Sequence, residues 1–151
     1  MSAFEIVRRT HIDADPGHVH DLVNDFRRWR GWSPWEEVDP GLQRDYDGPQ
    51  AGVGSAYSWS GNRKAGAGSM VITESSPERI GIEINFLKPF KATNQVAFDI
   101  VPASAGADVA WSMNGEQTGM AALFARLVNV ERLVGKDLEK GLARLKELAE
   151  S

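Results

Sequence analysis

The segment RIGIEINFL at residues 79–87 has the pattern of a half-buried β-strand. Isoleucine or phenylalanine occupies every even position from 80 to 86, and glycine, glutamate and asparagine occupy the odd positions between them. Successive side chains of a strand point to opposite faces, so this alternation gives one apolar face and one polar face. We therefore expect a strand of an antiparallel sheet that is covered by the rest of the protein on one side.

Shorter segments of the same kind lie on both sides of residues 79–87, separated by glycine, proline and asparagine. These residues favour turns and therefore separate one strand from the next. The further predicted strands are residues 4–13, 42–46, 56–60, 69–75, 91–101 and 109–114. The sheet is thus expected to have about seven strands.

The period of the sequence changes after the last predicted strand. Residues 120–150 contain no proline, and leucine or valine recurs every three or four positions from Leu123 to Leu148. This spacing predicts a long amphipathic C-terminal helix. Gly135 and Gly141 fall inside it. Because glycine in a helix costs on the order of 1 kcal/mol relative to alanine, we expect a bend or fraying there.

Two short helices are expected between the first and second strands. Asp13 or Asp15 can cap the first one, and Pro16 suits its first turn. Its apolar stripe follows helical spacing and comprises Val19, Leu22, Val23 and Phe26. Residues 27–31 are predicted to form the second short helix, and residues 36–40 an acidic loop.

Composition predicts one domain over residues 1–151, a usual domain length. The absence of cysteine excludes disulfides, thiolate nucleophiles and cysteine-bound metals. A net charge of −4 argues against a nucleic-acid partner. The apolar stretches are too short for membrane insertion, and no signal peptide is visible, so we expect a cytoplasmic protein. A protein partner cannot be named from the sequence.

These elements predict an α+β protein in which a curved antiparallel sheet grips the long C-terminal helix, an arrangement known as the helix-grip fold. A helix lying in a strongly curved sheet does not fill all the space beneath it. We therefore expect a central cavity, and mostly apolar cavities are common sites for small ligands.

Several local segments resemble the START-like superfamily, also called Bet v 1-like or SRPBCC, and in particular its polyketide cyclase/dehydrase-like branch. The matching segments are IDADP at 12–16, WRGWSPW at 29–35, residues 54–61, FLKPF at 86–90, WSMNG at 111–115 and GLARLK at 141–146. The resemblance covers nearly the whole chain and implies the helix-grip fold. Members bind lipids, sterols, hormones or polyketides, and some are enzymes.

The resemblance implies binding of a small hydrophobic molecule, such as a lipid, a polyketide or an aromatic metabolite. A polyketide cyclase or dehydratase-like enzyme and a protein-interaction module are the alternatives. The residues expected to line the cavity are large and apolar: Trp29, Trp32, Trp35, Tyr57, Trp59, Phe86, Phe90, Phe98, Trp111, Met113 and Phe124. Trp59, Trp111 and Met113 are the best placed, because they lie on strand faces opposite the long helix.

A cyclase would need an acid or base inside the apolar pocket. Tyr57 is the candidate catalytic residue, because it shares parity with Trp59 and should point inward. The other polar candidates near the predicted cavity are Arg63, Glu83, Asn85, Asn94 and Gln95. Glu83 and Asn85 should face solvent if the isoleucine face of their strand is buried.

Neither a metal nor a cofactor is expected. His18 and His20 are two residues apart on a helix and so do not share a face, and His11 lies apart from them. No zinc motif, dinucleotide-binding GxGxxG, P-loop or serine-hydrolase G-x-S-x-G is present. Lys88 and Lys91 are charged residues that could attract an anionic head group to the cavity mouth.

Overall fold

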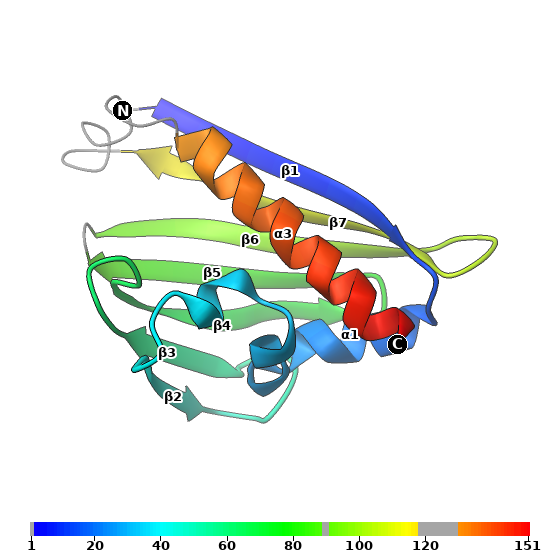
Figure 1. Ribbon diagram of the computed structural model, residues 1–151, viewed down its shortest axis with the longest axis horizontal. Helices are drawn as coiled ribbons and strands as arrows, with labels where there is room; N and C mark the ends of the chain where they lie inside the picture. Colours follow the sequence, from blue (N-terminus) through cyan, green and yellow to red (C-terminus); the bar gives the residue numbers. More distant parts are fainter. Residues whose placement is uncertain (1, 89–90, 118–129) are drawn as a thin grey trace.

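The computed structural model describes residues 2–88, 91–117 and 130–151. In chain order the strands are β1 (Ser2–Ile12), β2 (Gln43–Asp47), β3 (Ala56–Ser60), β4 (Ala67–Ser76), β5 (Arg79–Lys88), β6 (Ala92–Pro102) and β7 (Ala107–Gln117). The helices are α1 (Pro16–Asn24), the 3₁₀ helices η1 (Phe26–Gly31) and η2 (Pro34–Glu37), and α3 (Val130–Glu150) (Figure 1).

The seven strands form one antiparallel sheet in the order β1-β7-β6-β5-β4-β3-β2. From β2 to β7, each strand pairs with the next strand in the sequence, and β1 pairs with β7 as an edge strand of the sheet. Helix α3 lies across the sheet, packs on β1 and reaches α1 at its C-terminal end (Figure 1). The predicted α+β fold, with its seven strands and long C-terminal helix, is confirmed.

The alternation in β5 sets the inner and outer faces of the sheet. Ile80, Ile82 and Ile84 are almost completely buried against the core. Glu83 and Asn85 lie on the opposite, outer face and are half-buried there, where the Asn85 amide donates a hydrogen bond to the Glu83 carboxylate at 3.2 Å. The interpretation that these two polar residues point away from the core is therefore correct.

The segment expected to be an acidic loop at residues 36–40 is different in the structure. Pro34 begins the 3₁₀ helix η2, and the Ser33 hydroxyl accepts a hydrogen bond from the Trp35 amide at 3.3 Å. Proline at the first position and a capping serine are both favourable starts for a helix. The prediction of a loop is wrong at Glu36 and Glu37, because both belong to this short helix. The Glu36 side chain is only 7% exposed there.

Helix α3 is continuous through both of its glycines. A Cβ atom at Gly141 would lie 2.6 Å from the Trp111 ring, and one at Gly135 would overlap the Arg8 guanidinium. Gly141 therefore lets the helix approach an aromatic side chain of β7 closely. Residues 118–129 of the predicted helix lie outside the described part of the chain.

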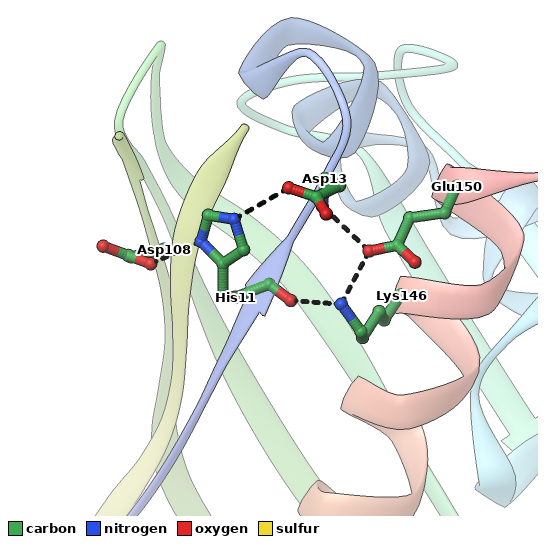
Figure 2. Close-up of polar contacts among 5 residues, drawn as sticks. All are labelled: His11, Asp13, Asp108, Lys146 and Glu150. Carbon is green, nitrogen blue, oxygen red and sulfur yellow. Dashed lines mark hydrogen bonds and ion pairs between the residues drawn. The ribbon is translucent and has the colours of Figure 1, made fainter. Parts of the chain in front are cut away.

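Polar contacts hold the C-terminal end of α3 against the end of β1 (Figure 2). The Lys146 ammonium donates to the His11 carbonyl at 2.8 Å and pairs with Glu150 at 2.6 Å. The Glu150 carboxylate also accepts from the Asp13 amide at 2.8 Å. The His11 ring lies between Asp108 at 2.8 Å and Asp13 at 3.0 Å, and the hydrogen bond to Asp108 contributes most to raising the pKa of His11.

Candidate functional site

The tryptophan-rich segment is anchored to the end of α1. The Trp29 indole donates to the Val23 carbonyl at 2.8 Å, and the Trp32 indole donates to the Leu22 carbonyl at 3.0 Å. These bonds satisfy carbonyl groups that the last turn of a helix leaves without partners. The Trp35 indole instead donates to Asp137 on α3 at 3.1 Å. The three tryptophans thus connect the first helices to the core and to α3.

Trp29 and Trp32 pack with Phe98 and Trp111 in a closed aromatic core. The Phe98 and Trp111 rings stack with centroids 4.7 Å apart, and Trp32 meets Trp111 edge-on at 5.5 Å. Phe98 and Trp111 have 0% exposure, so they contact neither solvent nor a void large enough for water. Met113 is 3% exposed. In this structure these candidate lining residues contact other core side chains.

A second group of aromatic residues, the aromatic row, crosses the other half of the inner face. It consists of Tyr46, Tyr57, Trp59 and Phe86, whose neighbouring ring centroids are 5.3, 6.2 and 5.9 Å apart. A Cβ atom at Gly68 would lie 2.6 Å from the Trp59 ring, so this glycine lets Trp59 lie across β4. Trp59 and Phe86 stay only partly buried, although they pack against the core.

A polar cluster adjoins the aromatic row, and we call it the Glu36 cluster: Glu36, Arg44, Tyr46 and Tyr57. The Glu36 oxygen Oε2 accepts from Arg44 Nε at 3.0 Å and from the Tyr57 hydroxyl at 3.1 Å. Arg44 also donates to the Glu36 backbone carbonyl at 3.2 Å. The Arg44 and Glu36 side chains are 16% and 7% exposed, so this ion pair is largely removed from water.

Two buried polar atoms of the cluster have no hydrogen-bond partner, namely Glu36 Oε1 and the Tyr46 hydroxyl. Among the described residues, two further buried atoms share this condition, Trp111 Nε1 and His20 Nε2. A buried polar group without a partner costs about 1–3 kcal/mol, and native proteins keep few of them. Two such atoms within one small cluster therefore call for a functional explanation.

The electrostatics of the cluster keep both phenols protonated. Burial raises the pKa of Tyr57, and the Glu36 carboxylate raises it further. Burial and Glu36 also raise the pKa of Tyr46. Burial opposes the charged form of Arg44, but its hydrogen bond to Glu36 and the charge of that carboxylate outweigh this effect and raise the Arg44 pKa. The tyrosines are thus hydrogen-bond donors at neutral pH, not bases.

The remaining residues that the sequence predicts for the site differ in their burial. Of the polar candidates, Asn94 is buried, whereas Arg63 and Gln95 are exposed. Phe90 and Phe124 lie outside the described residues. Within residues 2–88, 91–117 and 130–151, no three histidine, cysteine, aspartate or glutamate residues are grouped so that they could hold a metal ion. No helix in the described part of the chain is long and apolar enough to cross a membrane.

The model of one protein family, "Polyketide cyclase / dehydrase and lipid transport", matches residues 3–150. The chain belongs to this family. None of the curated proteins searched matches it significantly. The family membership confirms the resemblance that the local segments indicate.

Solved structures share the fold of this family member at low sequence identity. Protein CV1439 from Chromobacterium violaceum has a TM-score of 0.69 and 18% identity, covering 97% of this chain and 98% of that one. The di-domain ARO/CYC BexL of the BE-7585A biosynthetic pathway has a TM-score of 0.73 and 17% identity, over 99% of this chain and 50% of that chain. Ara h 8.0201 has a TM-score of 0.67 and 12% identity, covering 98% of each chain.

The sequence indicates Tyr57 as an inward polar residue, but it does not indicate the other three residues of the Glu36 cluster. The signal in β2 is short: Arg44 and Tyr46 share one parity and pair in register with Trp59 and Tyr57 of β3. Read together, the two strands predict four inward side chains side by side. Glu36 offers no such signal, because its direction depends on the local geometry of η2.

Proposed function

We propose that this protein binds a small hydrophobic molecule, such as a lipid, a polyketide or an aromatic metabolite, between the inner face of the sheet and α3. The observation that carries the proposal is the aromatic row, in which Trp59 and Phe86 lie on the inner face and yet are incompletely buried. Large aromatic side chains that the core leaves partly uncovered can gain apolar burial from a ligand, at roughly 25 cal/mol per Å². Membership of a family described by polyketide and lipid chemistry supports this proposal.

The proposed contact residues are Tyr57, Trp59 and Phe86, and we add the partly buried Trp35, which packs on Trp111. The four candidates Trp29, Trp32, Phe98 and Trp111 have at most 3% exposure, so we assign them to the packing that holds the sheet and helices together. They would contact a ligand only after a rearrangement of the core. The aromatic row needs a smaller change, because part of its surface is already uncovered.

A cyclase-like enzyme is the second candidate function, and the buried Glu36 carboxylate favours it. A general acid or base must lie within hydrogen-bond reach of the reacting atom. Tyr57 stays protonated and already donates to Glu36, so it would orient a ligand carbonyl or hydroxyl and would not remove a proton. The acid–base role, if the protein is an enzyme, falls to Glu36.

Native mass spectrometry of freshly purified protein, followed by solvent extraction and a screen of lipophilic compounds, tests the proposal. A co-purifying or tightly bound apolar molecule would support it and reveal its chemical class. Trp59→Leu should then weaken binding at least about tenfold. The control Leu133→Ala changes an apolar side chain that is 55% exposed on α3 and should leave binding unchanged. A clean protein that binds nothing in the screen would contradict the proposal.

A further inference from the structure

We propose that the Glu36 cluster recognises a hydroxyl group of the ligand, so that the ligand is a neutral phenol or alcohol and not a carboxylate or phosphate. The inference rests on the proposed function, because it concerns the polar end of a molecule that the aromatic row would hold. It follows from the two unpaired atoms of the cluster, Glu36 Oε1 and the Tyr46 hydroxyl.

Glu36 supplies the acceptor. Its oxygen Oε2 is occupied by Tyr57 and Arg44, but Oε1 is buried and receives no hydrogen bond. A carboxylate oxygen only accepts, so the missing partner must be a donor such as O–H or N–H. Because the Glu36 side chain is only 7% exposed, bulk water does not supply that donor in this structure.

Tyr46 supplies the donor. Its hydroxyl is buried and unpaired, and burial, followed by the Glu36 carboxylate, raises the pKa of Tyr46, so the phenol keeps its proton. The Tyr46 and Tyr57 rings lie 5.3 Å apart on paired strands, which places both tyrosines beside Glu36. A ligand hydroxyl, which donates once and accepts, satisfies both unpaired atoms: it donates to Glu36 Oε1 and accepts from Tyr46.

The charges of the cluster disfavour an anionic ligand. Arg44 is the cation inside the cluster, and Glu36 already neutralises it at 3.0 Å. A ligand carboxylate would bring a second negative charge to the unpaired side of Glu36, where low polarity strengthens the repulsion. The Arg27 guanidinium lies 4.7 Å from the centre of the Tyr46 ring, but Arg27 is exposed, so water screens its charge.

The cluster is closed in this structure. Neither Glu36 Oε1 nor the Tyr46 hydroxyl contacts solvent. The ligand hydroxyl therefore reaches them when a neighbouring side chain moves aside, and not by filling an existing void.

Three probes with the same apolar body test the inference: naphthalene, 2-naphthol and 2-naphthoate. Their dissociation constants at pH 7 are measured by quenching of tryptophan fluorescence and checked by isothermal titration calorimetry. We expect 2-naphthol to bind about tenfold more tightly than naphthalene, because it adds hydrogen bonds to a charged group and to a phenol. We expect 2-naphthoate to bind more weakly than naphthalene.

Two conservative variants assign the effect to the cluster. Glu36→Gln and Tyr46→Phe should each reduce the preference for 2-naphthol over naphthalene to about threefold or less. Naphthalene is measured on each variant as the reference, so that the ratio of the two affinities, and not the affinity for one probe, reports the loss of hydroxyl recognition. The matched control is Glu37→Gln, which removes the same charge from the next residue, whose side chain is 62% exposed. That variant should keep the full preference.

Each outcome supports or overturns a defined claim. Equal affinity for 2-naphthol and naphthalene would overturn the hydroxyl inference but leave ligand binding standing. Tighter binding of 2-naphthoate would overturn it in favour of recognition by a basic side chain. A preference for 2-naphthol that survives both cluster variants would place the hydroxyl elsewhere. Failure of all three probes to bind would overturn the inference, whereas the proposed function stands or falls with the screen of lipophilic compounds.

Discussion

Tyr46 and Tyr57 face each other across two paired strands, yet their hydroxyl groups have opposite roles in stability. Tyr57 donates to Glu36, whereas the hydroxyl of Tyr46 is buried without a partner. We expect Tyr57→Phe to lower the free energy of unfolding by about 1–3 kcal/mol, because Glu36 loses one of its donors in a buried site. Tyr46→Phe should be neutral or stabilising by up to about 1 kcal/mol. Urea denaturation of both variants measures this difference.

The comparison of the two tyrosine variants separates stability from binding. If Tyr46 serves a ligand, Tyr46→Phe stabilises the free protein while it weakens the binding of 2-naphthol. This opposition is common at functional sites, which keep groups that the folded state alone does not favour. Equal losses of stability in the two variants would show that the Tyr46 hydroxyl has a partner in solution.

The contacts of the His11 ring with Asp108 and Asp13 make the stability of the protein depend on pH. Its pKa lies above the ordinary value of 6.5, first because of the hydrogen bond to Asp108 and then because of Asp13. The stability that the protonated ring contributes is therefore fully present below about pH 6.5 and is lost as the pH rises through the folded-state pKa. We expect the melting temperature of the wild type to exceed that of His11→Gln most near pH 6, with the gap closing towards about pH 9.

The neighbouring Glu150 carboxylate has the opposite pH dependence and therefore limits the pH range of this test. The pKa of Glu150 is lowered, mainly by its hydrogen bond from Lys146, so its contribution is present above about pH 4.5 and is lost on acidification. Measurements above about pH 6 therefore report on His11 alone of these two. A gap between wild type and variant that stays constant over that range would contradict the assigned role of the His11 ring.

At the scale of elements, the two glycines of α3 have different reasons to be glycine. A methyl group at Gly141 would collide with the rigid Trp111 ring, whereas at Gly135 it would meet the movable end of Arg8. We expect Gly141→Ala to destabilise the protein by about 1–3 kcal/mol through overpacking. Gly135→Ala should be neutral or stabilising by up to about 1 kcal/mol, because alanine favours the helix. Thermal unfolding of the two single variants compares them directly.

These glycines also show what periodicity can and cannot predict about an element. The apolar spacing of residues 120–150 indicated a helix, and α3 (Val130–Glu150) has it. The strand at 79–87 is equally clear, because apolar residues alternate with glycine or polar residues from position 79 to position 86. The reason for Gly141 was not visible in the sequence, because Trp111 approaches it from 30 positions away in the chain.

At the scale of the whole molecule, the candidate site escapes sequence analysis because it is assembled from distant positions. Glu36 comes from η2, and the hydroxyl of Tyr57 reaches it over a separation of 21 residues. The sequence indicates a set of large aromatic residues as candidates for the ligand site. It does not show which of them form the closed core around Trp111 and which form the partly open aromatic row. That division depends on how completely the folded chain covers each side chain, from 0% exposure at Trp111 to partial burial at Trp59 and Phe86.

Ligand binding should stabilise the whole molecule, because a ligand that binds only the folded state shifts the unfolding equilibrium. At a free ligand concentration of 100 times the dissociation constant, the gain is about 2.7 kcal/mol. For a chain of this size, each kcal/mol raises the melting temperature by about 2–4 °C, so saturating 2-naphthol should raise it by about 5–10 °C. Differential scanning fluorimetry against ligand concentration measures the shift. Tyr46→Phe at the same 2-naphthol concentration should show a smaller rise in melting temperature, because the weaker complex is less saturated. An unchanged melting temperature of the wild type at saturation would mean that 2-naphthol does not favour the folded state.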